Sequence, residues 1–313
     1  MSKRIVIAVG GNALIEDKNH HSEGDQFNQV NKTCHHIAPL VEAGHEVVIT
    51  HGNGPQVGFI LQRSELCADK MDRMPIDSAG AQTQGAIGYY FVQNLKNIFQ
   101  EKKMENEVSA VVTQMIVNKD DPSFQNPNKP IGAFSNEEEA KELQEKYGWV
   151  MKEDAGRGWR RVVPSPLPLE TVEKNIIEIL LKNKSVVIAC GGGGVPVVRE
   201  ENGNLKGVEA VIDKDRSSAL LANEIKADDL IIATAVDFVY VNFNKPEQKK
   251  LEKVTVAELK EYIVQNQFAP GSMLPKIEAA IAFVENGGRE AIITSPEMLS
   301  KAINGESGTH ITL

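Results

Sequence analysis

The chain has few of the residues that build disulfide scaffolds or zinc centres. Its 313 residues include only three cysteines and seven histidines. Cys34, Cys67 and Cys190 are far apart and form no CxxC pair, which argues against both kinds of site. The adjacent histidines at 20–21 and 35–36 would point to different faces of a helix or strand. We therefore expect three reduced, partly buried thiols in a reducing compartment.

The chain also lacks an excess of positive charge and long apolar runs. The formal net charge is −9, so a broad attraction to nucleic acid or to an anionic membrane is not expected. No apolar run approaches the ~20 residues that span a bilayer, and the apolar stretch after Lys3 and Arg4 is short. We expect a cytoplasmic protein with no nucleic-acid and no membrane partner. Any anion site must then be built locally, from backbone N–H groups and a few lysines.

Two widespread nucleotide-binding motifs are absent. No G-x-x-x-x-G-K-[ST] occurs, so the chain is not a P-loop protein by sequence. Gly52-Asn53-Gly54 followed by Gly58 does not complete G-x-G-x-x-G, which weakens a dehydrogenase interpretation.

What the chain does have is a regular alternation of apolar strands and helices. Near-continuous apolar segments predict strands of a parallel sheet that is covered on both faces, and they lie at 5–9, 46–51, 186–190, 230–233 and 291–294. This rhythm predicts an α/β fold, a three-layer αβα sandwich around a mainly parallel sheet.

Helical patterns separate these strands. Apolar residues recur every three or four positions between Phe27 and Val41, and Gly44 is a natural stop. Thr255 and Glu258 form a capping-box pattern, and Pro275 is expected to begin a further helix through Val284.

Residues 118–166 interrupt the rhythm. Proline, glycine and charge are dense there and apolar periodicity is weak, apart from an acidic helical segment near 137–146. We interpret 118–166 as an inserted, protruding subdomain or lid within a single domain over 1–313.

A glycine-rich segment follows each of three predicted strands. Gly10-Gly11-Asn12, Gly52-Asn53-Gly54 and Gly191 to Gly194 each follow an apolar strand. Glycine lets the backbone approach an anion closely, and strand ends of an open parallel sheet are where ligands bind. One such pair can serve only to turn the chain. Three together favour a shared anion site, and Gly192 and Gly193 are included in it.

Three lysines stand where a transferred phosphoryl group needs cations. Lys214 lies between two acids, where the apolar segment 211–212, expected to be a strand, meets a helix starting near Arg216. It is either part of a salt-bridge cluster or a catalytic lysine oriented by Asp215. Lys276 lies in a first helical turn, where a bound phosphate would offset the unfavourable helix dipole. Lys129 lies in a proline-flanked segment, and is either an ordinary loop charge or a placed cation.

Asp237 and Tyr240 follow another strand end. They could hold the ribose and the ring of adenosine, or be a turn aspartate and a half-buried tyrosine.

In combination, these motifs resemble those of the carbamate kinases, a family within the amino-acid kinase superfamily. The matching stretches run in order over nearly the whole chain: 8–14, His51-Gly52-Asn53-Gly54-Pro55-Gln56-Val57-Gly58, Asn128-Lys129-Pro130-Ile131-Gly132, 160–166, 207–215 and 268–276.

The resemblance implies the amino-acid kinase fold with its protruding subdomain, usually as a homodimer. It implies reversible phosphoryl transfer between ATP, with Mg²⁺, and carbamate, often run toward ATP synthesis in arginine catabolism. Residues 1–220 would bind the acceptor and 221–313 the nucleotide. The metal ligands stay unknown.

Residue roles follow from the same resemblance. Lys129 and Lys214 would grip the phosphoryl group, Asp215 would orient Lys214, and Lys276 would touch the nucleotide phosphates. The acceptor acid and the transferred phosphoryl group would be bound by Gly10, Gly11, Asn12, Gly52, Asn53 and Gly54. Lys214 would also bind the nucleotide, whose pocket would be lined by Asp237, Tyr240 and Met273.

Two alternatives remain at this point. One is a related kinase acting on another small carboxylate acceptor, although the glycine-rich site offers few side-chain partners for a larger acid. The other is a nucleotide-sensing protein without activity, against which the retention of all three lysines argues.

Overall fold

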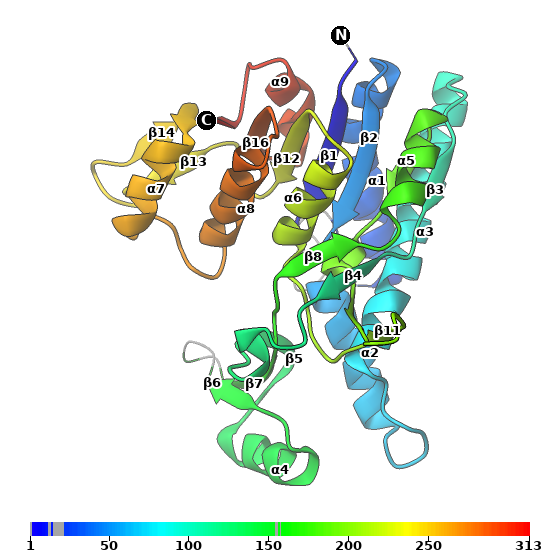
Figure 1. Ribbon diagram of the computed structural model, residues 1–313, viewed down its shortest axis with the longest axis vertical. Helices are drawn as coiled ribbons and strands as arrows, with labels where there is room; N and C mark the ends of the chain where they lie inside the picture. Colours follow the sequence, from blue (N-terminus) through cyan, green and yellow to red (C-terminus); the bar gives the residue numbers. More distant parts are fainter. Residues whose placement is uncertain (1, 12–13, 15–21, 154–155, 157) are drawn as a thin grey trace.

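A computed structural model describes residues 2–11, 14, 22–153, 156 and 158–313. Its centre is an eight-stranded sheet (Figure 1). In spatial order the strands are β15 (Lys253–Thr255), β17 (Thr309–Thr312), β16 (Glu290–Thr294), β12 (Asp229–Ala233), β1 (Arg4–Val9), β2 (Glu46–His51), β9 (Val186–Ile188) and β3 (Val108–Ala110). All pair in parallel except β16 with β17, so the predicted mainly parallel sheet is confirmed.

Both faces of this sheet are buried. Val6 and Ala8 of β1 belong to one apolar core, with residues of α5 (Lys174–Lys182), α6 (Lys214–Glu224) and α8 (Met273–Glu285). Ile5, Ile7 and Val9 belong to the other, with residues of α1 (Glu23–Glu42), α3 (Ile76–Lys102) and α9 (Leu299–Ile303). Alternate side chains of one strand thus serve two helix layers, which is why the strand is apolar at every position. The predicted three-layer sandwich is confirmed (Figure 1).

Helix ends follow local sequence signals. Thr255 caps α7 (Val256–Val264) in a capping box with Glu258, as predicted. Two expected boundaries were wrong: α8 begins at Met273, before Pro275, and α6 begins at Lys214 after the cap residue Asp213. Residues 211–212, expected to be a strand, pair with no strand, and the Val211 N–H donates to the Pro164 carbonyl.

Three smaller sheets complete the described chain. One joins β11 (Leu205–Gly207), β10 (Val195–Arg199), β4 (Gln114–Val117) and β8 (Pro168–Thr171), and another joins β13 (Val239–Val241) and β14 (Lys249–Leu251). The third has the order β5 (Lys129–Ser135), β7 (Trp159–Val163) and β6 (Met151–Glu153). With α4 (Glu137–Tyr147) it projects from the body next to α2 (Gly54–Leu66) (Figure 1). We call β5, α4, β6 and β7 the projecting unit.

Cys34 and Cys190 are buried free thiols, but Cys67 is exposed, so the expectation of three partly buried thiols was wrong for Cys67. Among the described residues no helix is long and apolar enough to cross a bilayer.

Candidate active site

The glycine-rich strand ends meet at one edge of the central sheet. The Gly10 N–H donates to the carbonyl of Ala233 at the end of β12, at 3.1 Å. The Gly52 N–H donates to the carbonyl of Val9 at the end of β1, also at 3.1 Å. Because β1, β2 and β12 are parallel neighbours, their carboxyl ends present these loops side by side, as expected for an open parallel sheet.

The third glycine loop, a short 3₁₀ turn at Gly191–Gly193, packs against the second. A Cβ on Gly192 would lie 2.2 Å from the side-chain nitrogen of Asn53. A Cβ on Gly193, whose φ is +94°, would lie 2.4 Å from the carbonyl oxygen of Ile212. Asn53 is itself held by a 2.8 Å hydrogen bond that it donates to Thr83. Only glycine fits both positions, so the loops form one close-packed cradle.

Two lysines converge on one buried carboxylate beside this cradle. Lys214 in the first turn of α6 pairs with one oxygen of Asp215, and Lys276 of α8 pairs with the other at 2.9 Å. The Asp215 side chain is only 4% exposed. A Cβ on Gly52 would lie 3.5 Å from Cδ of Lys214, so this lysine runs along the backbone of the second glycine loop.

The third lysine reaches the same place from the projecting unit. Lys129, at the start of β5, pairs with Asp213 at 3.0 Å. Asp213 also caps α6, because its other oxygen accepts the N–H of Asp215 at 3.0 Å. Each of the three predicted lysines is therefore paired with one of two aspartates, Asp213 and Asp215, that flank Lys214 in the chain.

Burial and charge act against each other on the pKa values of this cluster. Burial lowers the pKa of Lys214, and Asp215 opposes that shift. Burial alone would raise the pKa of Asp215, but Lys214 and Lys276 outweigh it, so the pKa falls. Burial would likewise raise the pKa of Asp213, and Lys129 brings it down to about 2. The site thus holds ionised carboxylates and closely spaced lysines in a dry setting, where an incoming phosphoryl group interacts strongly with ammonium groups.

The predicted nucleotide residues lie after β12, the strand next to β1, and at the start of α8. Asp237 lies in the loop after β12, Tyr240 lies in β13, and Met273 begins α8 three residues before Lys276. In the described chain the side chains of Asp237 and Tyr240 are not among the partners of the lysine cluster. Met273 and Lys276 share one helix face, which links this region to the cluster.

The remaining predicted residues are placed as follows. Gly11 adjoins Gly10 and Gly54 begins α2, each with open space where a Cβ would be. Asn12 lies outside the described residues.

Sequence reasoning missed several residues that shape the site. Asp213 was noted only as a neighbour of Lys214, although an aspartate just before a helix is a recognisable cap signal. Ser217 donates to the Gly193 carbonyl at 2.6 Å. His51 is buried, and its Nδ1–H donates to the Gly52 carbonyl at 2.8 Å. No sequence pattern identified these two contacts: the first joins segments 24 positions apart, and the second depends on the turn of the chain after β2.

Within the described ranges, no three His, Cys, Asp or Glu side chains gather as a metal-ion cluster. A magnesium ion that keeps several waters and is bound mainly by substrate phosphates needs no such cluster, so this site is compatible with one.

Comparison with known proteins gives concordant matches. The model of a family described as the amino acid kinase family matches residues 3–295. The carbamate kinase of Thermococcus kodakarensis is 50% identical over 312 residues, covering 99% of both chains. The carbamate kinase of Pyrococcus horikoshii is 48% identical over 314 residues, covering 100% of both. Among solved structures, carbamate kinase from Giardia lamblia bound to AMP-PNP superposes with a TM-score of 0.94 at 42% identity, covering 99% of this chain and 98% of that one.

Proposed function

The chain belongs to the amino acid kinase family, and on that basis we propose that it is a carbamate kinase, which transfers a phosphoryl group between ATP and carbamate. The observation that carries the proposal is the cluster of Lys214, Lys276 and Lys129 beside the glycine cradle. Relatives named carbamate kinase match the chain over its full length. ATP and ADP are therefore substrates of this enzyme.

The proposed mechanism is direct in-line transfer. Phosphoryl transfer needs chiefly positioning and cations on the shared oxygens, and the three lysines supply those cations. We assign Lys129 and Lys214 to the moving phosphoryl group, and Asp215 to the orientation of Lys214. Lys276 is assigned to the nucleotide phosphates. Buried Cys34 and Cys190 have raised thiol pKa values because of burial, which makes them poor nucleophiles and favours transfer without a covalent enzyme intermediate.

The acceptor is proposed to lie on the glycine cradle. Gly10, Gly11, Asn12, Gly52, Asn53, Gly54, Gly192 and Gly193 form the acceptor and phosphate set. Carbamate is small enough to be bound chiefly by backbone N–H groups, whereas a larger acid would need side-chain partners. Asp237, Tyr240 and Met273 are proposed to line the nucleotide pocket, so that 1–220 serves mainly the acceptor and 221–313 mainly the nucleotide. Residues 118–166 would act as the lid that carries Lys129.

Mg²⁺ is proposed to arrive with the nucleotide. It would neutralise charge on the phosphates when bound, and we assign it no protein ligand.

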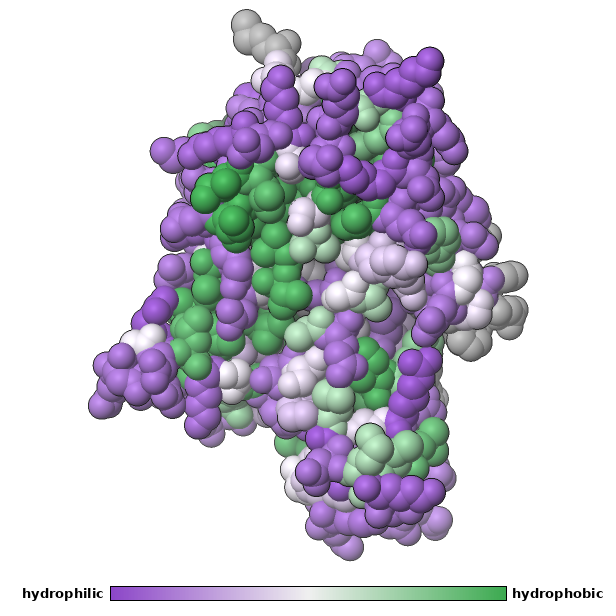
Figure 2. Space-filling view, turned by 90° about the vertical axis from the view of Figure 1, so that its right-hand side faces the viewer, coloured by the Kyte–Doolittle hydropathy of each residue, from purple (hydrophilic) through white to green (hydrophobic). Residues whose placement is uncertain are grey.

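We further propose a homodimer in the cytoplasm, working toward ATP synthesis in arginine catabolism, with no nucleic-acid or membrane partner. Exposed apolar side chains support the dimer, and they include Tyr89 of α3, Leu169 of β8, and Ile176 and Ile179 of α5. Figure 2 faces the side on which α3 and α5 lie in Figure 1, and apolar surface gathers there. Three free thiols fit a reducing compartment, and the net charge of −9 disfavours nucleic acid.

The decisive experiment supplies carbamoyl phosphate, ADP and Mg²⁺ and follows ATP in a coupled assay. We expect rapid ATP formation, lowered roughly 100- to 1000-fold by Lys214→Ala without loss of the fold. Exposed Lys206→Ala serves as the matched control and should leave the rate unchanged. No ATP from a folded, nucleotide-binding protein would remove carbamate as the acceptor. A near-normal rate in Lys214→Ala would refute the role of that lysine.

A further inference from the structure

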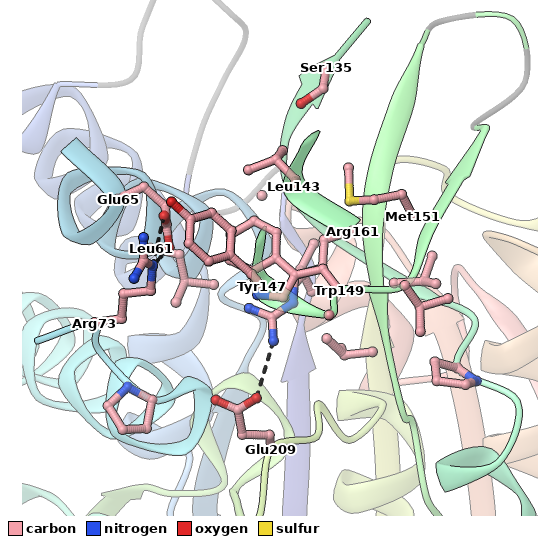
Figure 3. Close-up of a pocket in the computed structure, with 18 of the residues that line it drawn as sticks. Leu61, Glu65, Arg73, Ser135, Leu143, Tyr147, Trp149, Met151, Arg161 and Glu209 are labelled. Atoms are coloured by element: carbon pink, nitrogen blue, oxygen red, sulfur yellow. Dashed lines mark hydrogen bonds and ion pairs between the residues drawn. The ribbon is translucent and has the colours of Figure 1, made fainter. Parts of the chain in front are cut away.

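A cavity lies between the projecting unit and the body, and none of the three clustered lysines lines it (Figure 3). Its volume is about 510 Å³, which is within the range of small-molecule pockets. Leu61 and Glu65 of α2, and Arg73 from the loop that follows, form the body wall. The facing wall comes from the projecting unit and the segment after α4, and includes Leu143, Tyr147, Trp149, Met151 and Arg161.

The walls of this cavity are partly aromatic. The guanidinium carbon of Arg73 lies 3.9 Å from the ring centroid of Tyr147, and that of Arg161 lies 4.4 Å from the ring centroid of Trp149. The two rings are 5.2 Å apart and meet at the centre of the view in Figure 3. Both rings are only partly covered by protein. Aromatic rings, here tilted by 42° to each other, and guanidinium planes favour a planar, largely apolar ligand.

The cavity lining carries two arginines that are already paired with glutamates, Arg73 with Glu65 and Arg161 with Glu209. A carboxylate on the ligand would have to replace one of these glutamates. Arg161 pairs with Glu209 of the body at 3.1 Å (Figure 3), but the two partners are unequally exposed, at 18% and 57%. Glu209 can turn into water at little cost, whereas Arg161 stays at the wall of the cavity. A planar anion entering the cavity can therefore replace Glu209 and accept a bidentate pair from the guanidinium group.

None of the three lysines lines the cavity, but strand β5 runs between the cavity and the cluster. A Cβ on Gly58 of α2 would lie 3.7 Å from Cα of Gly132 in β5, so the helix and strand are close there. Ile131 of the same strand lines the cavity, while Lys129 at its start pairs with Asp213. A ligand that fills the cavity would hold β5 against α2, and with it the position of Lys129.

We propose that this cavity is a binding site for a planar organic carboxylate, distinct from the acceptor and nucleotide sites, with Arg161 as its anion-binding residue. The proposal concerns binding and does not depend on the reaction that the lysine cluster catalyses.

Calorimetric titration of the full chain with naphthalene-2-carboxylate, and with the isosteric 2-naphthamide, tests this. We expect the carboxylate to bind at one site about tenfold or more tightly than the amide. Arg161→Gln should remove that difference, while Arg199→Gln, a change of an exposed arginine paired with Glu170, should not. Glu209→Gln removes the internal competitor and should strengthen carboxylate binding. Because Glu209→Gln leaves Arg161 in place, it still tests the proposal if Arg161→Gln disturbs the projecting unit.

Lys214→Ala locates the probe. It should bind naphthalene-2-carboxylate as the unaltered protein does, because the cavity lies outside the lysine cluster. Equal affinities for the two probes, no binding of either, or weakening by Glu209→Gln would overturn the proposal. So would loss of the carboxylate in Lys214→Ala with retention in Arg161→Gln, because the anion would then lie at the lysine cluster.

Discussion

At the scale of single residues, Asp213 has two separable roles. One carboxylate oxygen accepts backbone N–H groups at the start of α6, and the other pairs with Lys129. Its position directly before a helix could be predicted from sequence. Its pairing with a lysine 84 positions away could not, because nothing local brings the projecting unit to this edge of the sheet.

Asp213→Asn and Asp213→Ala should separate these roles. Asparagine keeps the cap and alanine loses it, so only alanine should lower unfolding free energy through the cap, by about 1 kcal/mol. Both remove the charge that places Lys129, so both should lower kcat/KM, roughly 10- to 100-fold. Urea unfolding and steady-state kinetics give the two readouts. Full activity in Asp213→Asn would show that the ion pair does not matter for turnover.

His51 makes stability depend on pH. Burial lowers the pKa of His51 from 6.5 to about 4, with a smaller contribution from Lys214, although the Gly52 carbonyl opposes the shift. Below pH 6.5 His51 binds a proton in the unfolded chain, whereas in the folded chain it binds one only near pH 4. The stability present above pH 6.5 is therefore lost as the pH falls through this window, by about 3 kcal/mol in total.

The measurement compares unfolding free energies at pH 7 and pH 4.5. His51→Gln should show a flatter profile than the unaltered protein, since glutamine does not titrate. His310, whose pKa is raised chiefly by its hydrogen bond to Glu290, titrates in both proteins and cancels in the difference. Parallel profiles would contradict the assignment to His51.

At the scale of elements, strands were the best-predicted features. The apolar segments at 46–51 and 291–294 appear as β2 and β16 within a residue of their predicted ends. The strand predicted to reach 190 stops at Ile188, because Cys190 has a positive φ of 50° that turns the chain into the glycine loop. The β5–β7–β6 sheet was not predicted, since proline and glycine mask its pattern and its pairing is not local.

The glycine loop after β9 should tolerate no side chain at Gly193. Gly193→Ala adds a Cβ 2.4 Å from the Ile212 carbonyl at a positive φ, so we expect a loss of at least about 2 kcal/mol in unfolding free energy. Gly85→Ala is the matched control, because Gly85 lies in α3 with open space around its Cα. It should stabilise by roughly 0.5–1 kcal/mol. Denaturant unfolding measures the free energy of unfolding of both variants. Equal changes in Gly193→Ala and Gly85→Ala would refute the close-packed cradle.

At the scale of the whole molecule, sequence indicated the layers but not the surfaces. Apolar periodicity predicts which side chains face the core, yet it does not distinguish a buried partner helix from a second subunit. Ile176 and Ile179 of α5 illustrate this, since they are apolar, three residues apart and exposed at 43% and 52%.

Replacing both isoleucines with serine should turn the proposed dimer into a monomer, because association would no longer remove their apolar surface from water. Light scattering coupled to size-exclusion chromatography measures the mass. Val264→Ser, at the exposed last residue of α7, should leave the mass unchanged. An unaltered protein that is already monomeric would rule out the homodimer.

The pairing of lysines with aspartates also governs how substrates find the site. Three ammonium groups facing two carboxylates leave a single excess positive charge, on a molecule whose formal net charge is −9. At distances beyond a Debye length, about 8 Å at physiological ionic strength, the negative net charge repels an approaching nucleotide, and no long-range attraction guides it to the site. We therefore expect the bimolecular rate constant for ADP, measured by stopped flow, to rise as salt is added from low concentration. The enzyme would then bind ADP after unguided diffusional encounter, with attraction confined to the last few ångströms. A bimolecular rate constant that falls steeply with salt would show long-range steering instead.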